Sequence, residues 1–214
     1  MPVWWGKNQS GMQAKEELDS SEKNIAQLIW LAGRDKAIEC VKEMSTLGLH
    51  KQIANRMLEP WFNIRIILTG TEFDNFFMLR CHPDAQPEIQ ALAYKMRDLY
   101  RDNEPKKLHH GEWHVPFGDK ISVDRVHALG GNPWSGKTQS DIVKIAVARC
   151  ARVSYFNFEG KDDYAADIKL CDRLFASEPK HLSPTEHVAQ CMDGNDFIAN
   201  FRGWKQYRKL LEGV

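Results

Sequence analysis

Apolar residues recur at intervals of three and four near the start of the chain, and this spacing predicts a long helix. The stretch SSEKNIAQLIWLAGRDKAIECVKEMSTLG, residues 20–48, carries isoleucine, leucine, valine and methionine at this spacing. Ser20 or Ser21 is a suitable N-cap residue, Glu22 lies in the first turn, and Gly48 marks the end. We therefore expect one capped helix over these residues.

The later pattern contains more helical segments and one alternating segment. The isoleucine-rich stretch WFNIRIILTGT, residues 61–71, alternates as a strand does. Residues 102–140 are rich in charge, histidine, glycine and proline and predict an irregular connecting region. Further helices are expected at residues 52–58, 72–81, 87–100, 141–153, 162–176 and 200–211. The sum predicts an α/β (α+β) class: a helix-rich single domain, residues 1–214, with a small mixed or antiparallel sheet.

The charge balance limits the classes of partner. Lysine plus arginine and aspartate plus glutamate each number 29, so no overall charge attracts the chain to nucleic acid or acidic membranes. No apolar run approaches the roughly 20 residues of a membrane helix, and the N-terminus lacks a signal peptide's apolar core. We expect a cytoplasmic protein that binds neither nucleic acid nor membranes.

The cysteines predict a reduced protein. They are widely spaced and include no C-x-x-C, which is typical of reduced thiols, mostly buried, and not of a disulfide framework. The five are Cys40, Cys81, Cys150, Cys171 and Cys191.

The segment GGNPWSGKT, residues 130–138, contains the letters of a phosphate-binding loop. Such a loop needs a buried strand before it and a helix after it. Here charged residues interrupt the preceding ISVDRVHALG, the loop proline removes one N–H donor, and no apolar strand ending in aspartate follows. We predict a surface connection before a helix, and not an NTPase site.

Four blocks of sequence carry a more specific signal. They are GLHKQIANRMLEP (residues 48–60), NFFMLRCHPDAQPEI (75–89), ARVSY (151–155) and HLSPTEH (181–187). Together they resemble the flavin-dependent thymidylate synthase family, or thymidylate synthase complementing proteins. Its members carry N-F-x-x-L-R, A-Q-x-E-I, A-R-V-S-[YF] and H-x-[ST]-P-x-E-H.

The order of these blocks departs from the family. Most members place A-R-V-S-Y and S-P-x-E-H first, whereas here they follow N-F-x-x-L-R, as in a circular permutation. In a permuted member the signature R-H-R-x-x-S-x-N-x-x-S-x-R is expected just upstream of WWGKNQ. We therefore expect a missing preceding segment, with Trp4 and Trp5 at the junction with a partner piece.

The R-H-R signature, which binds flavin and nucleotide in the family, is missing from the sequence. The most similar segment is FRGWKQYRK, residues 201–209, in which Trp204 and Arg208 agree with the family's signature. Gln206 and Tyr207 replace the Arg-His pair. The resemblance therefore leaves open whether the chain acts alone.

The resemblance implies nucleotide contacts in the first half of the chain. Arg80 is the implied catalytic and substrate-binding residue, reaching the uracil ring or phosphate of dUMP and stabilising negative charge on the pyrimidine. Arg56, or Asn55 at the aligned position, is the implied second phosphate contact, and Asn75 the implied flavin contact. Taken alone, Arg80 also suits the C-terminal end of a helix, and Asn75 suits a helix surface.

The implied FAD contacts in the second half are Ser154, His181, Ser183 and Glu186. The letters S-P-T-E also form a capping box, in which Ser183 caps a helix and Glu186 closes the box without any ligand. As a flavin site, this helix start offers N–H groups and the positive end of the helix dipole.

Two groups of histidines are candidate zinc ligands, although neither has a recognised ligand spacing. His181 and His187 flank Glu186, and a second group lies in LHHGEWH at residues 108–114. We predict no metal site and regard His109, His110 and His114 as loop histidines.

The resemblance implies a flavin-dependent thymidylate synthase: dUMP is methylated to dTMP with methylenetetrahydrofolate and NADPH as co-substrates and FAD as cofactor. It also implies a homo-oligomer, a tetramer in the family. The alternative is a catalytically incomplete fragment, or one half of a split enzyme, that needs a partner chain carrying the R-H-R segment.

Overall fold

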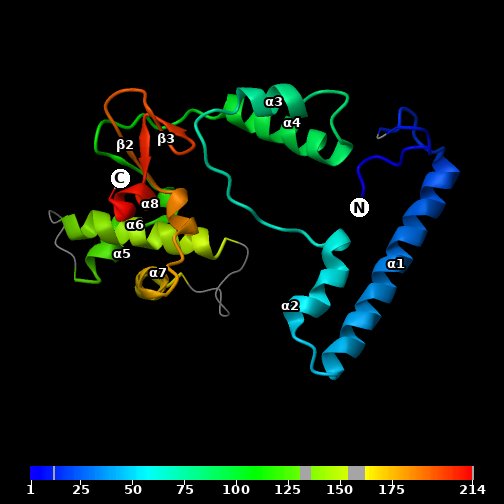
Figure 1. Ribbon diagram of the computed structural model, residues 1–214, viewed down its shortest axis with the longest axis horizontal. Helices are drawn as coiled ribbons and strands as arrows, with labels where there is room; N and C mark the ends of the chain where they lie inside the picture. The colour runs from blue at the N-terminus through cyan, green and yellow to red at the C-terminus, as the bar shows by residue number, and fades with distance from the viewer. Residues whose placement is uncertain (12, 131–135, 154–161, 214) are drawn as a thin grey trace. The chain divides into compact units, whose positions relative to one another are not determined.

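The computed structural model describes residues 1–11, 13–130, 136–153 and 162–213 (Figure 1). Contacts between residues divide the chain into two units. Unit 1 comprises Met1–Ile64 and Asp74–Glu104, and unit 2 comprises Arg65–Phe73 and Pro105–Val214. Helices predominate in both, and the sheet is small and antiparallel, so the predicted helix-rich α+β class is confirmed.

Unit 1 begins with the predicted long helix, α1, at Ser20–Thr46. Its N-cap residue is Asp19, one position before the predicted serines: the Asp19 carboxylate accepts hydrogen bonds from the backbone N–H groups of Ser21 and Glu22, both at 2.9 Å. The Glu22 carboxylate accepts one from the Asp19 N–H in return. This reciprocal capping box satisfies amide groups that a helix otherwise leaves unpaired.

Three tryptophans of unit 1 pack against one another around α1. Trp5 contacts Trp30 of α1 edge-on at 6.3 Å between ring centroids, and Trp30 contacts Trp61 at 5.6 Å. Trp5 therefore has a partner within unit 1, whereas Trp4 is 39% exposed. The predicted short helix at 52–58 is two elements, α2 (Lys51–Ala54) and the 3-10 helix η1 (Asn55–Trp61).

A helical hairpin completes unit 1. It consists of α3 (Asp74–Arg80) and α4 (Pro87–Asp102), with Pro87 in the first turn of α4 as predicted. The predicted strand at 61–71 is wrong: the segment from Phe62 to Phe73 has no strand. A strand requires a backbone ladder with a neighbour, and alternation alone does not supply one.

Unit 2 is built around the helix α6 (Gly136–Ala151), which packs on α7 (Tyr164–Ala176) and on α5 (Val123–His127). The buried core residues are Ile121, Val126, Val143, Ile145, Ala146, Val147, Tyr164, Cys171 and Val188. The region 102–140 contains α5, the strand β1 (Trp113–His114) and the 3-10 helix η2 (Gly118–Lys120), together with the start of α6. Residues 121–130 contain a helix and no strand, so the strand that a phosphate-binding loop needs is absent there; residues 131–135 of that motif lie outside the described residues.

The sheet of unit 2 has the order β1-β2-β5 and is antiparallel throughout. Its strands are β1 (Trp113–His114), β2 (Ala189–Cys191) and β5 (Trp204–Gln206). A separate hairpin pairs β3 (Phe197–Ile198) with β4 (Phe201–Arg202), and α8 (Tyr207–Glu212) follows β5.

The predicted helix at 200–211 is therefore wrong over its first half. Two positive backbone angles produce tight bends there: Ala199 has φ 57° in the β3–β4 turn, and Gly203 has φ 72° between β4 and β5. A side chain at Gly203 would bring its Cβ to 3.2 Å from the Gly194 carbonyl oxygen. Glycine at this position permits the bend that a helix would not make.

All five cysteines are free thiols, as predicted. Cys150 and Cys171 are buried, and burial raises the pKa of each to about 12. The other three, Cys40, Cys81 and Cys191, are partly exposed, so the prediction that most of the cysteines are buried is wrong. No helix among the described residues combines the length and apolarity needed to cross a membrane.

Candidate active site

The predicted nucleotide-binding residues of unit 1 lie on two elements. Asn75 and Arg80 belong to α3, and Asn55 and Arg56 begin η1. All four are exposed, and their side chains make no hydrogen bond or ion pair with any other described residue. Their polar groups are therefore open to a ligand.

Helix geometry separates the two residues of α3. Five positions along an α-helix correspond to about 140° around the axis. Asn75 and Arg80 therefore point in different directions. This suits contacts to two different ligand groups, and not joint contacts to one small group.

The chain after Arg80 is held in place. The Tyr94 hydroxyl of α4 donates a hydrogen bond to the Cys81 carbonyl at 3.0 Å, and the Gln90 side-chain amide donates to the His82 carbonyl. Phe77 of α3 packs on Tyr100 of α4, with ring centroids 5.6 Å apart. These contacts fix the end of α3 that carries Arg80 against α4.

In unit 2, the HLSPTEH block does not form the predicted capping box. Ser183–Glu186 is a 3-10 helix, η3, whose N-cap residue Leu182 makes no side-chain cap. The hydroxyl of the buried Thr185 donates to the Leu182 carbonyl at 2.6 Å, and the Glu186 carboxylate is ion-paired with Arg208. A four-residue 3-10 helix provides no extended dipole, and the contact of this segment with flavin remains a prediction.

The pairing of Glu186 with Arg208 joins two segments that the sequence singled out separately. Arg208 belongs to FRGWKQYRK, the segment most similar to the missing signature. The Gln206 side chain reinforces the junction by donating to the Asn200 side-chain oxygen at 2.7 Å and to the Glu186 carbonyl at 3.3 Å. His181 and Ser183 remain exposed beside this cluster.

His187 has a role that the sequence reasoning did not assign. Its Nδ1 lies 2.9 Å from the Thr69 hydroxyl, 118 positions away in the chain. Burial lowers the pKa of His187 below its ordinary value, and the neighbouring Glu186 carboxylate opposes this shift. Among the described residues, no group of three or more histidine, cysteine or carboxylate side chains is arranged to hold a metal ion.

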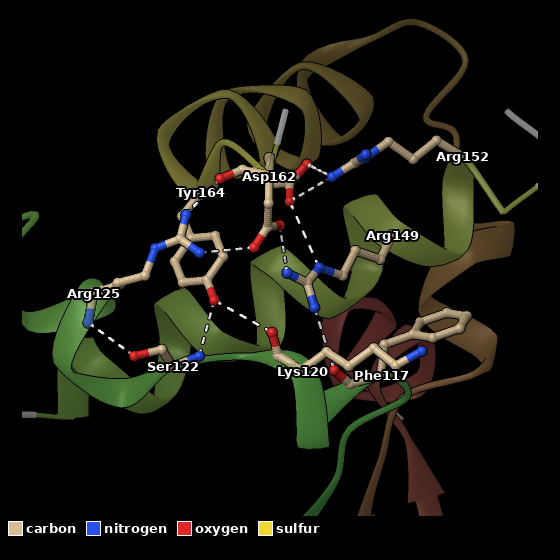
Figure 2. A network of polar contacts seen from close by, with 9 residues as sticks. Phe117, Lys120, Ser122, Arg125, Arg149, Arg152, Asp162 and Tyr164 are labelled. Carbon is tan, nitrogen blue, oxygen red and sulfur yellow. Dashed lines mark hydrogen bonds and ion pairs between the residues drawn. The ribbon is translucent and has the colours of Figure 1, made fainter. Parts of the chain in front are cut away.

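A second polar network includes Arg152 of the ARVSY block, and most of its members appear in Figure 2. Arg152 donates to both carboxylate oxygens of Asp167, at 2.6 and 2.7 Å, and the Asp167 side chain is only 4% exposed. Burial raises the pKa of Asp167, while Arg152 and Arg149 oppose the rise. Ser154, the predicted FAD contact in this block, lies outside the described residues.

The same network ties α5 to α6 and α7. Figure 2 shows Asp162 between two arginines: Arg125 at 2.8 Å and Arg149 at 2.7 Å. Both guanidinium groups lie near the Tyr164 ring, at 4.0 and 5.4 Å from its centroid. The Tyr164 hydroxyl accepts a hydrogen bond from the Ser122 N–H at 2.8 Å. These contacts hold α5, α6 and α7 together and so stabilise the helical part of unit 2.

Comparison with known proteins tests the resemblance to the flavin-dependent thymidylate synthase family. Residues 7–106 match the thymidylate synthase complementing protein family. The resemblance is thereby confirmed over these residues. The range includes Asn55, Arg56, Asn75 and Arg80, whose roles remain predictions. No curated protein and no solved structure matches the chain.

The match supports a function of the flavin-dependent thymidylate synthase type in general terms. The ARVSY and HLSPTEH blocks lie beyond the matched residues, so the permuted order and the FAD contacts in these blocks remain predictions.

Proposed function

We propose that the chain acts in the reductive methylation of dUMP to dTMP, with FAD as cofactor and with methylenetetrahydrofolate and NADPH as co-substrates. One observation carries the proposal: the family match includes the whole of α3, whose Asn75 and Arg80 are exposed and unpaired among the described residues. The proposal includes a cytoplasmic homo-oligomer, in keeping with the family resemblance.

Arg80 is suited to the pyrimidine nucleotide. Its guanidinium is permanently charged and presents several donors in one plane, which matches a uracil ring edge or a phosphate. No described carboxylate neutralises it. Held at the end of α3, it stabilises negative charge that develops on the pyrimidine when C5 attacks the one-carbon unit. Arg56 or Asn55 supplies a second contact to the phosphate.

Each unit, taken separately, offers exposed polar side chains as candidate flavin contacts. Asn75 offers an amide donor and acceptor for the edge of the ring, and His181 and Ser183 are exposed polar groups in unit 2. Glu186 is paired with Arg208 in this segment, and its contact with FAD remains a prediction. FAD, when bound, supplies the hydride chemistry that these side chains cannot perform.

Ligand titrations of matched variants test the proposal. Wild-type protein is mixed with FAD and followed by its visible spectrum, and dUMP is then titrated by isothermal calorimetry. Arg80→Gln should weaken dUMP binding about tenfold or more, because a charged hydrogen bond is lost. Arg101→Gln, an exposed arginine on α4, should leave it unchanged. Equal weakening by both variants, or no binding of either ligand, contradicts the proposal.

The absence of an R-H-R-x-x-S sequence from these 214 residues favours a second candidate, a half-site that needs a partner chain. The titrations are therefore repeated with a peptide carrying that segment. Ligand binding that appears only with the peptide favours the half-site, and binding that is the same without it rules the half-site out.

A further inference from the structure

One side of α1, the long capped helix of unit 1, is apolar and exposed (blue in Figure 1). Ile25 is 56% exposed, Leu28 and Ile29 are each 68% exposed, and Ala32 is exposed on the next turn. Residues three and four positions apart share one side of a helix, so these four side chains form a continuous row. We call them the apolar stripe.

The apolar stripe is not the side of α1 that packs within unit 1. That side carries Trp30, which contacts Trp61, together with the buried Ala37 and Val41. Since each residue turns an α-helix by about 100°, the apolar stripe lies about 150° around the axis from these three residues of α1. The helix therefore has two apolar sides, one packed within unit 1 and one open.

An open apolar stripe on a well-formed helix is typical of a protein–protein contact. Continuous exposed apolar patches bordered by polar residues mark interaction sites on soluble proteins. The cap at Asp19 and the packing of the opposite side already order α1. Association therefore costs little additional conformational entropy in the helix itself.

Charged residues at the two ends of the apolar stripe indicate which partner fits it. Glu22 lies three positions before Ile25, and Lys36 lies four positions after Ala32. Both are nearly equally far from the midpoint of the stripe, and their distances along the axis differ by one residue, or about 1.5 Å. Two such helices placed antiparallel about this midpoint bring Lys36 of each copy beside Glu22 of the other.

Lys36 is available for such a contact. It pairs with Glu39 of its own helix at 2.8 Å, and both side chains are largely exposed to solvent. An exposed pair of this kind contributes little stability, and the lysine ammonium has three donors. A carboxylate from a second copy therefore adds a contact to Lys36 without displacing Glu39.

We propose that the apolar stripe is a dimer interface, in which α1 of one copy lies antiparallel to α1 of a second copy of this chain. Ile25 of each copy then faces Ala32 of the other, a large side chain opposite a small one, and the Glu22–Lys36 pair occurs twice and sets the register. The stripe covers only about two turns, so the contact forms a weak, concentration-dependent dimer. The inference rests on the homo-oligomer of the proposed function and not on its dUMP chemistry.

Sedimentation velocity over a wide range of protein concentrations tests the apolar stripe without any ligand. Leu28→Glu places a carboxylate near the centre of both sides of the interface and should raise the dimer dissociation constant about tenfold or more. Leu99→Glu is the matched control, because Leu99 is a similarly exposed leucine on α4, and it should leave the dissociation constant unchanged. Circular dichroism compares the helical content of the two variants.

Three results of this experiment overturn the proposal. They are a wild-type chain that is monomeric at every concentration, an assembly that Leu28→Glu leaves unchanged, and an assembly that Leu99→Glu weakens equally. A chain that dimerises through the apolar stripe but binds no dUMP contradicts the proposed function alone.

A charge exchange tests the antiparallel register. Glu22→Lys and Lys36→Glu should each raise the dissociation constant about threefold or more, because each places like charges opposite one another across the interface. The double variant restores opposite charges and should recover most of the wild-type affinity. The two positions are 14 residues apart, about 21 Å along one helix, so the recovery cannot arise within a single copy. A double variant that dimerises no better than either single variant overturns the antiparallel pairing.

Discussion

Asp167 shows how a single buried charge supports unit 2. It lies in α7 and accepts two hydrogen bonds from Arg152, the arginine of the ARVSY block at the end of α6. Burial disfavours its charged form, which is why its pKa is raised in spite of this partner. The pair therefore stabilises the fold only while both members are present.

Removal of that charge should be costly. Asp167→Asn leaves Arg152 buried without its counter-ion, and we expect a loss of about 3–5 kcal/mol in the free energy of unfolding at pH 7. Urea unfolding followed by circular dichroism measures it. Asp172→Asn is the control on the same helix: its side chain is 53% exposed and pairs with Lys144, so the expected loss is below about 1 kcal/mol. Equal losses would show that the burial of Asp167 contributes nothing.

At the scale of elements, the capping box at the start of α1 is the clearest local determinant. Asp19→Ala removes the acceptor of two backbone N–H groups and should cost about 1 kcal/mol of stability. Asp35→Ala, an exposed aspartate in the middle of α1, should change it by no more than about 0.5 kcal/mol. A thermal-denaturation series of the two variants tests this, and the expectation fails if Asp35→Ala costs as much as Asp19→Ala.

Elements with local signals were predictable from the sequence. The periodic helix at 20–46, the start of α4 at Pro87 and the helix α7 all follow from spacing and capping letters. The stretch 61–71 alternates as a strand does, yet the chain provides it with side-chain anchors and no strand pairing. Pairing depends on distant residues, which a local pattern does not contain.

In the candidate site, too, local features were predictable from the sequence and contacts between distant residues were not. The NFFMLRC letters placed Asn75 and Arg80 on a helix, and the structure agrees; their roles in ligand binding remain predictions. The roles of Glu186 and His187 depend on partners 22 and 118 positions away, so the local S-P-T-E letters predicted a capping box that does not form. No sequence signal marked Thr69 as a partner of His187.

For the molecule as a whole, His187 makes stability dependent on pH. Its pKa in the folded protein is lowered, so between that value and the ordinary value near 6.5 the unfolded chain binds more protons. The stabilising contribution is therefore present above pH 6.5 and is lost as the pH falls toward the lowered pKa. Below the lowered pKa, a further fall in pH causes no further loss of stability from His187.

His187→Gln should accordingly flatten the pH dependence. Relative to wild type, the variant should lose less stability between pH 7 and pH 5, by up to about 1.4 kcal/mol for each unit of pKa shift. Urea midpoints measured across that range provide the test. Parallel curves for the two proteins would contradict the lowered pKa.

Turnover tests the central claim most directly. The purified chain is incubated with FAD, NADPH, methylenetetrahydrofolate and dUMP, and dTMP is quantified by liquid chromatography and mass spectrometry, with and without the R-H-R peptide. We predict dTMP formation that requires dUMP and FAD and falls at least tenfold in Arg80→Gln but not in Arg101→Gln. No dTMP under either condition, or equal dTMP from Arg80→Gln and wild type, would contradict the account.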